Sequence, residues 1–340
     1  MNTIISREFA QYEKAFEAEY EKACDAANEK AFEAAIQSDN ATLQEVLNYI
    51  HLQRGKQLRP QLVLLSAALT HGITDKTIQT AVALELLHTA TLIHDDVVDN
   101  SPTRRGKAAV HEHWSNKVAV LVGDYILAQV INIIDDLRCT PITHVVAQMG
   151  KNLSSGELTQ LHAGRSMWIS EKQYYEVIRL KTAELFASCA QAGAFSSMAT
   201  PKQVTALKNF GLHLGMCFQL KDDILDYSDS EELGKPTMND IRDGKATLPL
   251  IISLERAVPQ EAETIRQLAE DLVRHAPHID EHEAEEDIKA FVMRYQGVKY
   301  AYKKIEEHRK KAVEVLNFFP HSETKQALLD MLTYAIQRER

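Results

Sequence analysis

Apolar and polar positions recur with helical spacing along almost the whole chain. Near the start, four aromatic residues fall on one helical face: Phe9, Tyr12, Phe16 and Tyr20. This spacing predicts an amphipathic helix within residues 1–40 that packs one face on the rest of the protein. Pro60 suits the first turn of a helix through QLVLLSAAL. Further helices are predicted over 77–99, 117–136, 144–163, 171–196, 202–227, 245–256, 260–275, 284–295, 297–317 and 322–338.

No segment shows sustained alternation of period two, so the fold class is predicted to be all-α. Helix breakers are sparse, with 13 Gly and 9 Pro among 340 residues. The loops between the predicted helices are short, and the chain has no linker or low-complexity tract. We therefore predict one all-helical domain over residues 1–340, which is near the upper size for a single core.

Charge and cysteine usage narrow the class of protein. The net charge of −10 argues against general binding to nucleic acid or anionic lipid. The four cysteines form no C-x-x-C pair, and the first residues lack the basic and apolar regions of an export signal, which predicts a cytoplasmic location with reduced thiols. Residues 118–134 are strongly apolar, but Asp124 interrupts them and they are short for a membrane span. They are predicted to form a buried helix.

Two acidic clusters repeat the spacing D-D-x-x-D. They consist of Asp95, Asp96 and Asp99, and of Asp222, Asp223 and Asp226. On a helix, the members of each cluster fall at about 0°, 100° and 40°, on one face within a single turn. Neighbouring carboxylates repel one another unless cations lie between them, and oxygen ligands without nearby cysteine favour Mg²⁺. A solvated helix end would explain one such cluster, but two, both ending apolar helices, favour a metal site.

Basic residues bracket both clusters. They are Lys56, Arg59, Arg104, Arg105, Lys181, Lys235 and Lys245. Each alone is most often a solvated surface cation. As a set beside two metal-binding faces they indicate two anionic groups, one bound through metals and one held directly by Lys and Arg. His88 lies about two turns before Asp95 at nearly the same angle, where it could reach such an anion.

Glu85 and His88 also form E-x-x-H, the di-iron signature of some helical bundles. A di-iron site needs two such pairs. No other histidine in the sequence has Glu three residues before it, so this alternative is set aside.

Seven segments together resemble the all-trans polyprenyl diphosphate synthases. In chain order they are GKQLRP, LIHDDVVDNSPTRRG, GDYILA, GELTQ, KTAELF, FQLKDDILDY and LGKPTMNDIRDGKATLPLI. The similarity runs from about residue 40 to the end, where AIQRER resembles medium- and long-chain members. Arg54 departs from the pattern, since the family often has a second glycine there. The resemblance implies a helical bundle of the isoprenoid synthase type around a deep central cavity, usually in a homodimer.

The resemblance also implies a role for each matching residue, with about three Mg²⁺ ions around an allylic diphosphate. The direct metal ligands would be Asp95, Asp99 and Asp222, supported by Asp96, Asp223 and Asp226. The allylic diphosphate would contact Arg104, Lys181, Lys235 and Lys245. Isopentenyl diphosphate would contact Lys56, Arg59, His88 and Arg105. The reacting centre would be lined by Thr182 and Gln219.

The implied reaction ionises the allylic diphosphate, and the isopentenyl double bond then attacks the cation. The released pyrophosphate accepts the last proton, so no dedicated catalytic His or Glu is needed. A class I terpene cyclase has no second diphosphate to bind, and its second metal motif normally carries Asn, Ser or Thr. A non-catalytic synthase subunit generally loses motif residues, whereas this chain keeps all of them.

Product length is expected to depend on the helix that carries the first cluster. Leu84, Leu87, Ala90 and Thr91 descend below the metal site and are predicted to line the tunnel into which the product grows. Short-chain members usually block this tunnel with an aromatic residue four or five positions before the first Asp, where this chain has Thr91 and Ala90. The expected product is therefore medium or long, octaprenyl-like and destined for a quinone tail, with transient membrane contact on release. A farnesyl or geranylgeranyl product is the alternative.

Overall fold

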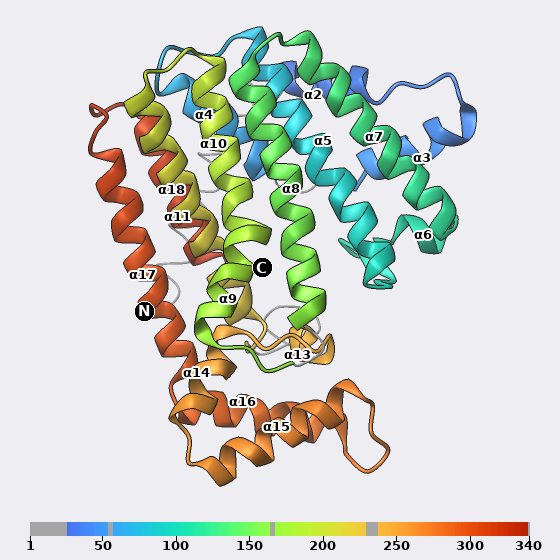
Figure 1. The fold of residues 1–340 in the computed structure, drawn as a ribbon, viewed down its shortest axis with the longest axis vertical. Coiled ribbons are helices and arrows are strands. Elements are labelled where there is room, and N and C mark those ends of the chain that lie inside the picture. The colour runs from blue at the N-terminus through green and yellow to red at the C-terminus, as the bar shows by residue number, and fades with distance from the viewer. Residues whose placement is uncertain (1–25, 54–56, 164–166, 229–236, 339–340) are drawn as a thin grey trace. The chain divides into compact units, whose positions relative to one another are not determined.

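The computed structural model describes residues 26–53, 57–163, 167–228 and 237–338, and every long element among them is a helix (Figure 1). The prediction of an all-α fold is confirmed. The elements are α2 (Ala26–Ala35), α3 (Ala41–His51), α4 (Leu58–Ala68), α5 (Asp75–Val98), β1 (Thr103–Arg104), β2 (Lys107–Ala108), α6 (Val110–His113), α7 (Asn116–Asp136), α8 (Thr140–Ala163), α9 (Glu171–Ile178), the π-helical turn η2 (Arg179–Ala183), α10 (Glu184–Ser196), α11 (Pro201–Leu225), α13 (Asn239–Arg242), α14 (Leu248–Arg256), α15 (Pro259–Val273), α16 (Glu281–Arg294), α17 (Gly297–Leu316) and α18 (Glu323–Gln337). The four aromatic residues predicted to form a helix near the start lie outside the described residues.

The chain forms two compact units, each assembled from segments distant in sequence. Unit 1 contains Met1–Gly150, Phe186–Gly211 and Leu316–Met331. Unit 2 contains Lys151–Leu185, Leu212–Val315 and Leu332–Arg340. The first acidic cluster belongs to unit 1 and the second to unit 2. The single-domain organisation stays a prediction.

Helix α5 is the central element of unit 1 and packs against α2, α4, α6 and α7. Its middle turns are buried on all sides, as shown by four consecutive residues with no exposed surface: Ala81, Val82, Ala83 and Leu84. A helix that is apolar all round belongs in a core. Thr74 begins α5 with a capping box, in which its side chain accepts from the Thr77 N–H and its own N–H donates to Thr77 Oγ1. The opposite end of α5 carries the first acidic cluster.

Gly123 allows α7 to approach α5 beside that cluster. A Cβ built at Gly123 would lie 2.1 Å from His94 Nε2. The same nitrogen lies 3.2 Å from the Val120 carbonyl oxygen and 3.7 Å from the Asp124 carboxylate. His94 immediately precedes Asp95, so the glycine fixes the distance of the first acidic cluster from α7.

The prediction that residues 118–134 form a buried helix is wrong for one face of α7. Val122, Ile126 and Val130 are buried, but Leu121 is 67% exposed and Ile131 is 69% exposed. The number of apolar residues in a helix does not tell how many of its faces are covered by the rest of the same chain. Among the described helices, α7 alone is long and apolar enough to cross a membrane by length and composition, and 33% of its most apolar stretch is buried in the structure.

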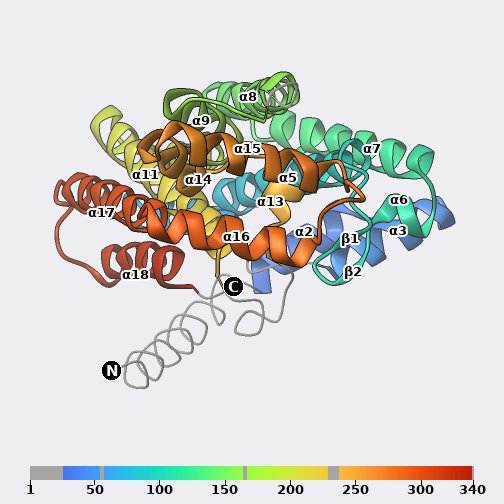
Figure 2. The same ribbon diagram turned by 90° about the horizontal axis from the view of Figure 1, so that it is seen from below.

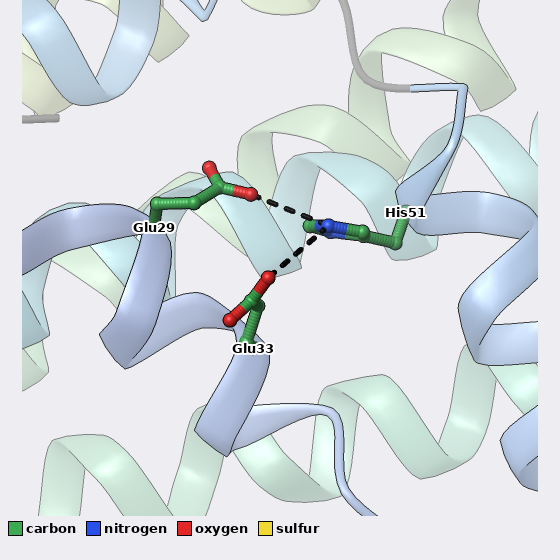
Figure 3. A group of neighbouring side chains, drawn as sticks. All are labelled: Glu29, Glu33 and His51. Carbon is green, nitrogen blue, oxygen red and sulfur yellow. Dashed lines mark ion pairs between the residues drawn. The ribbon is translucent and has the colours of Figure 1, made fainter. Parts of the chain in front are cut away.

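Helices α2 and α3 are joined by two carboxylates and a histidine (Figure 3). His51 Nε2 lies 3.3 Å from Glu29 Oε1 and 3.8 Å from Glu33 Oε1. The Phe32 ring stacks on the imidazole, with centroids 5.9 Å apart. Glu29 and Glu33 are one turn apart on α2, so one imidazole of α3 contacts both carboxylates and links the two helices.

In unit 2, α15 and α16 lie side by side (Figure 2), and α14 packs against both of them and against α9. Asp280 begins α16 by accepting the N–H groups of His282 and Glu283 at 3.0 and 3.1 Å. The short helix α13 rests on α15. Helix α13 is the first described helix after the second acidic cluster.

Candidate active site

The first acidic cluster occupies the C-terminal end of α5. Asp95 and Asp96 lie in its last turn, and Asp99 is the C-cap, with its N–H donating to the Asp95 carbonyl at 2.8 Å. The C-terminus of a helix is the negative end of its dipole, where each acidic side chain costs about 0.3–1 kcal/mol. The helix dipole therefore disfavours three acids there, whereas a bound cation would offset that cost.

Asp96 is held by Arg104 from the small hairpin of β1 and β2. Its side chain is 4% exposed, and its Oδ1 accepts from Arg104 Nε at 2.9 Å and from Nη2. The hairpin turn needs two residues with positive φ, and Arg105 and Gly106 supply them at 52° and 75°. The turn thus directs Arg104 back toward α5. A buried and paired Asp96 fits its predicted role of supporting the metal ligands.

A cluster of cations lies around His88 on α5. Burial and the nearby Arg59, Arg105 and Arg104 hold the pKa of His88 well below its usual value. His88 is therefore neutral at physiological pH and can donate one N–H to an anion without adding charge. Arg59 lies in the first turn of α4, with its guanidinium carbon 5.2 Å from the centroid of the Phe186 ring. Three of the four residues predicted to hold isopentenyl diphosphate thus lie in unit 1, and the fourth, Lys56, lies outside the described residues.

Glu85 is the counter-charge that the sequence interpretation missed. It is 6% exposed, and with Gln53, Thr89, Asp96, Arg104 and Arg105 it lines a pocket of unit 1. Burial lowers the pKa of Arg105, and the Glu85 carboxylate opposes that shift. Arg105 Nη1 also donates to the Gln53 carbonyl at 2.6 Å. The sequence interpretation considered Glu85 only as part of E-x-x-H, whereas in the structure its charge acts on Arg105, which sequence spacing does not reveal.

The second acidic cluster lies at the C-terminal end of α11, again at the negative end of a helix dipole. Asp223 is 2% exposed, accepts from the Tyr174 hydroxyl and accepts from Gln219 Nε2 at 2.8 Å. Gln219 Oε1 in turn accepts from Thr182 Oγ1 at 2.7 Å. The two residues predicted to line the reacting centre are therefore adjacent, and their orientation is fixed through a carboxylate of the cluster.

Thr182 and Lys181 lie in η2, the π-helical turn between α9 and α10. Such turns are rare and occur frequently at functional sites, because they turn side chains away from the regular helical direction. Lys181 Nζ lies 2.5 Å from Glu157 Oε1 of the GELTQ segment. Lys181, predicted to contact the allylic diphosphate, is therefore paired with a carboxylate in this structure.

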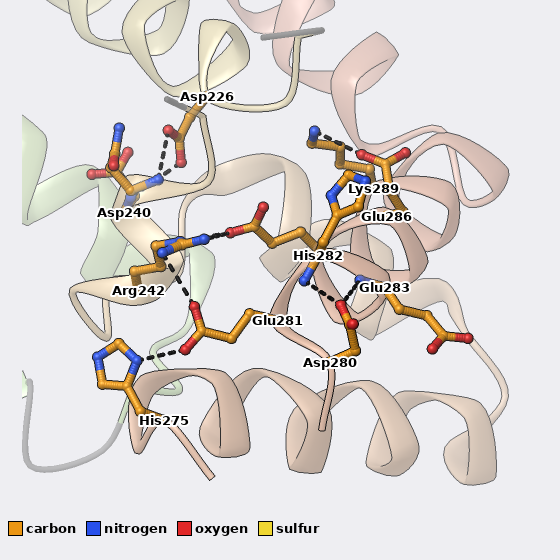
Figure 4. Close-up of polar contacts among 12 residues, drawn as sticks. Asp226, Asp240, Arg242, His275, Asp280, Glu281, His282, Glu283, Glu286 and Lys289 are labelled. Carbon is orange, nitrogen blue, oxygen red and sulfur yellow. Dashed lines mark hydrogen bonds and ion pairs between the residues drawn. The ribbon is translucent and has the colours of Figure 1, made fainter. Parts of the chain in front are cut away.

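Asp226 anchors the start of α13. Its two carboxylate oxygens accept the N–H groups of Asn239 and Asp240 at 3.0 and 3.1 Å, at the start of α13 (Figure 4). Lys245 follows, with its N–H donating to the Asp240 carbonyl at 2.7 Å and its Nζ 3.1 Å from Asp243. Lys235, predicted to contact the same diphosphate, lies outside the described residues.

Helix α13 is tied to α16 by Arg242 (Figure 4). Arg242 Nε donates to Glu285 Oε1 at 2.6 Å, and its Nη1 lies 3.3 Å from Glu281. His275 Nδ1 lies 2.7 Å from Oε1 of Glu281, whereas Arg242 contacts the Oε2 atom of the same carboxylate. These contacts hold α13, whose first N–H groups donate to Asp226, so Asp226 fits its predicted supporting role.

The acidic groups of unit 2 fit a hard divalent cation. Burial raises the pKa of Asp223 to about 7 and that of Asp226 to about 6. Burial and the neighbouring Asp226 raise the pKa of Asp240 well above its usual value. Carboxylates that hold protons so strongly lack sufficient positive charge around them. Their oxygen donors are those that Mg²⁺ prefers.

Mg²⁺ is expected to stabilise the protein more at about pH 8 than at about pH 5. The pKa values of Asp223 and Asp226 are raised in the folded state, so folding retains protons that the unfolded chain releases near pH 4. Their contribution to metal-free stability is therefore greatest below about pH 4 and is lost as the pH rises through about 6 and 7. A bound cation offsets this loss at high pH.

The measurement is the rise in melting temperature on adding millimolar MgCl₂ across this pH range. The double variant Asp223→Asn, Asp226→Asn is the control, and its Mg²⁺ response should vary less with pH. An equal rise at both ends of the pH range in the wild type contradicts the assignment of these carboxylates to a metal site.

Comparisons with known proteins agree on one family. The profile of the polyprenyl synthetase family matches residues 40–284. The octaprenyl diphosphate synthase of Haemophilus influenzae is 34% identical over 304 residues, which cover 89% of this chain and 90% of that protein. The geranylgeranyl diphosphate synthase of Saccharolobus solfataricus is 30% identical over 315 residues, which cover 90% of this chain and 93% of that protein.

The fold matches a solved structure of the same family. The polyprenyl synthase of Caulobacter crescentus, complexed with calcium and isoprenyl diphosphate, has a TM-score of 0.87 and 32% identity, with 96% of this chain and 98% of that chain covered. The acidic clusters at two helix ends, the cations around them and these similarities lead to one conclusion: the chain belongs to the polyprenyl synthetase family and is a polyprenyl diphosphate synthase, a prenyltransferase.

Proposed function

We propose that this enzyme condenses isopentenyl diphosphate with an allylic diphosphate in trans and repeats the step to a medium or long product, octaprenyl-like, for a quinone side chain. The observation that carries the proposal is the pairing of two complete Asp clusters with a separate cation cluster around His88. The first feature suits a diphosphate bound through metals, and the second suits a diphosphate bound directly.

The residues divide by substrate. For isopentenyl diphosphate, neutral His88 donates a hydrogen bond, and Arg59 and Arg105 neutralise the phosphate charge, together with Lys56. For the allylic diphosphate, the contacts come from Arg104, Lys181, Lys235 and Lys245. Glu85 balances the cations of the first group when no anion is bound.

Mg²⁺, about three ions held by Asp95, Asp99 and Asp222, would supply electrostatic stabilisation of the departing pyrophosphate. The calcium in the Caulobacter crescentus complex supports a divalent cation beside the diphosphate. Thr182 and Gln219 direct their side-chain oxygens toward the allylic cation. The hydrogen bond from Gln219 Nε2 to Asp223 prevents the Gln219 amide from flipping. Lys181, released from Glu157, holds the pyrophosphate while it accepts the proton from the new chain.

A cytoplasmic homodimer is part of the proposal. The outer face of α7 exposes Val120, Leu121 and Ile131. A second copy of the chain would cover this apolar face. Light scattering of Leu121→Glu, compared with the wild type, tests the dimer, because a buried carboxylate in a symmetric interface is strongly unfavourable.

The test of the reaction uses the purified protein with MgCl₂, farnesyl diphosphate and labelled isopentenyl diphosphate. Pyrophosphate release is expected only when both substrates are present, and reversed-phase analysis of the dephosphorylated products is expected to show chains well beyond geranylgeranyl. Release without isopentenyl diphosphate indicates a terpene cyclase. No release from any allylic substrate indicates a non-catalytic subunit.

A further inference from the structure

Arg338 lies beside the second acidic cluster at the end of the described chain. Its Nη2 donates to Asp222 Oδ1 at 2.7 Å and to the Phe218 carbonyl at 2.8 Å. Its guanidinium carbon lies 3.7 Å from the centroid of the Phe218 ring, and its Nε donates to the Ala335 carbonyl at 3.4 Å. The C-terminal end of the chain thus contacts a residue expected to bind a metal directly.

The guanidinium is held largely without Asp222. The Phe218 ring and two backbone carbonyls supply three of its four contacts. The Arg338 side chain is 9% exposed, whereas that of Asp222 is 42% exposed. Arginine stays charged at any relevant pH, so its burial requires acceptors and a π face of this kind. Arg338 is therefore the fixed partner of the pair, and Asp222 is the one open to solvent.

We propose that Arg338 is a positioning residue for the metal site: it holds one oxygen of the Asp222 carboxylate and leaves the other oxygen for a divalent cation. This inference rests on the proposed function, in which Asp222 is a direct Mg²⁺ ligand. Mg²⁺ demands nearly ideal octahedral geometry, so the angle at which a carboxylate is held matters. Partners that orient a metal ligand typically change metal affinity or activity 10–100-fold when they are removed.

The other aspartates of the cluster have their own supports. Asp223 is held by Tyr174 and Gln219, and Asp226 is held by backbone N–H groups at the start of α13. The Asp222 side chain is 42% exposed, and its Oδ1 pairs with Arg338. Arg338, which directly follows α18, therefore supports one specific residue of the cluster rather than the cluster in general.

The opposite effect would arise if Arg338 competed with the metal, since both are cations on one carboxylate. The three contacts that do not involve Asp222 argue against competition, because leaving them would strand a buried charge. The two effects have opposite signs on metal affinity, and binding measurements separate them.

The test compares Arg338→Gln and Arg338→Lys with the wild type. Free Mn²⁺ is followed by electron paramagnetic resonance in a titration of the protein without substrate, and the Mg²⁺ concentration for half-maximal product formation is measured separately. Arg338→Gln is expected to weaken Mn²⁺ binding and raise that Mg²⁺ concentration about 10–100-fold, with most turnover restored at saturating Mg²⁺. Arg338→Lys should lose less Mn²⁺ affinity than Arg338→Gln, because lysine keeps the positive charge. It should still bind more weakly than the wild type, because lysine lacks the planar guanidinium. Arg309→Gln is the matched control, because Arg309 is 44% exposed and pairs with Glu306 within α17.

A double-mutant cycle with Asp222→Asn tests whether the effect passes through that carboxylate. In the Asp222→Asn background, Arg338→Gln should change Mn²⁺ affinity by less than about threefold, since the carboxylate through which Arg338 acts on the cation is already removed. Unchanged or tighter Mn²⁺ binding by Arg338→Gln in the wild-type background overturns the inference. If Arg338→Gln melts well below the wild type without metal, its weaker Mn²⁺ binding could reflect poor folding. The Mn²⁺ affinities of Arg338→Lys and of the double-mutant cycle then decide whether Arg338 positions Asp222. If Arg338→Gln weakens Mn²⁺ binding as expected but the wild type makes no prenyl product, the role of Arg338 stands and only the proposed function is refuted.

Discussion

Asp95→Ala and Asp99→Ala are each expected to lower turnover at least ~10²-fold, because each removes a proposed direct ligand of the cations that would stabilise the departing pyrophosphate. The fold should persist. Both residues lie at the negative end of the α5 dipole, where a carboxylate is unfavourable by about 0.3–1 kcal/mol. Without metal, these variants should melt at or slightly above the wild-type temperature.

Asp222 is expected to show an equal loss of turnover but a different effect on stability. Asp222→Ala leaves the buried guanidinium of Arg338 without its carboxylate, so this variant should melt below the wild type. Asp222→Asn keeps an oxygen acceptor for Arg338 and should fold better while still losing turnover.

Asp75 provides a matched control on the same helix as Asp95. It lies in the first turn of α5, at the positive end of the dipole, and it is exposed. Asp75→Ala should leave turnover unchanged and lower stability by about 0.3–1 kcal/mol. Steady-state kinetics at saturating Mg²⁺ and thermal melts measure both quantities. A well-folded Asp95→Ala enzyme with near-normal turnover would show that the first cluster does not bind the catalytic metals.

Much of the helical organisation could be predicted from the sequence, because apolar periodicity and caps are local signals. The helix predicted over 77–99 is α5, and the helix predicted over 202–227 is α11, each within two residues of the observed ends. The run predicted over 171–196 hides a π-helical turn, since such a turn depends on packing around Thr182 rather than on local propensity. The exposed face of α7 was also missed, because periodicity shows which residues are apolar but not what covers them.

Within the site, residue types were predictable and most partners were not. D-D-x-x-D is a local pattern, and both clusters lie at helix ends as expected. Tyr174 reaches Asp223 across 49 residues, and nothing in EKQYYEVI marks that tyrosine for the contact. Arg338 was visible only as part of a closing segment that resembles longer-chain synthases. Such contacts arise from tertiary packing, which a spacing argument does not contain.

Thr91→Phe is expected to shorten the product to farnesyl or geranylgeranyl diphosphate while leaving the first condensation largely active. Thr91 lies one turn before Asp95 on α5, about 6 Å below it at 1.5 Å per residue. A ring there would close the tunnel just beneath the metal site, where a short chain still fits but a longer one does not. The Thr91 hydroxyl donates only to the His88 carbonyl of its own helix, at 2.8 Å, so its loss breaks no contact between helices.

Ala90→Phe is the less direct test of the same tunnel. Ala90 is fully buried. An added ring in a packed core displaces its neighbours, which typically lowers the free energy of unfolding by about 1–3 kcal/mol. A shorter product from Ala90→Phe must therefore be read together with its melting temperature. Thr91 is only half-buried, so its variant should fold normally.

A deeper block should give an intermediate product. Leu87 lies about 12 Å below Asp95 along α5. Leu87→Trp is expected to give chains longer than those of Thr91→Phe and shorter than those of the wild type. Thr143→Phe is the matched control, because Thr143 is exposed on α8 and its hydroxyl also donates within its own helix, to the Cys139 carbonyl at 3.2 Å. The control should leave the product unchanged.

Reversed-phase analysis of dephosphorylated products decides between the outcomes. A graded series, with the shortest product from Thr91→Phe, identifies this face of α5 as the wall along which the chain grows. Unchanged products from Thr91→Phe, Ala90→Phe and Leu87→Trp place the tunnel on another helix face. A wild-type product no longer than farnesyl contradicts the long-chain assignment itself, because Ala90 and Thr91 would then leave open a tunnel that some other residue closes.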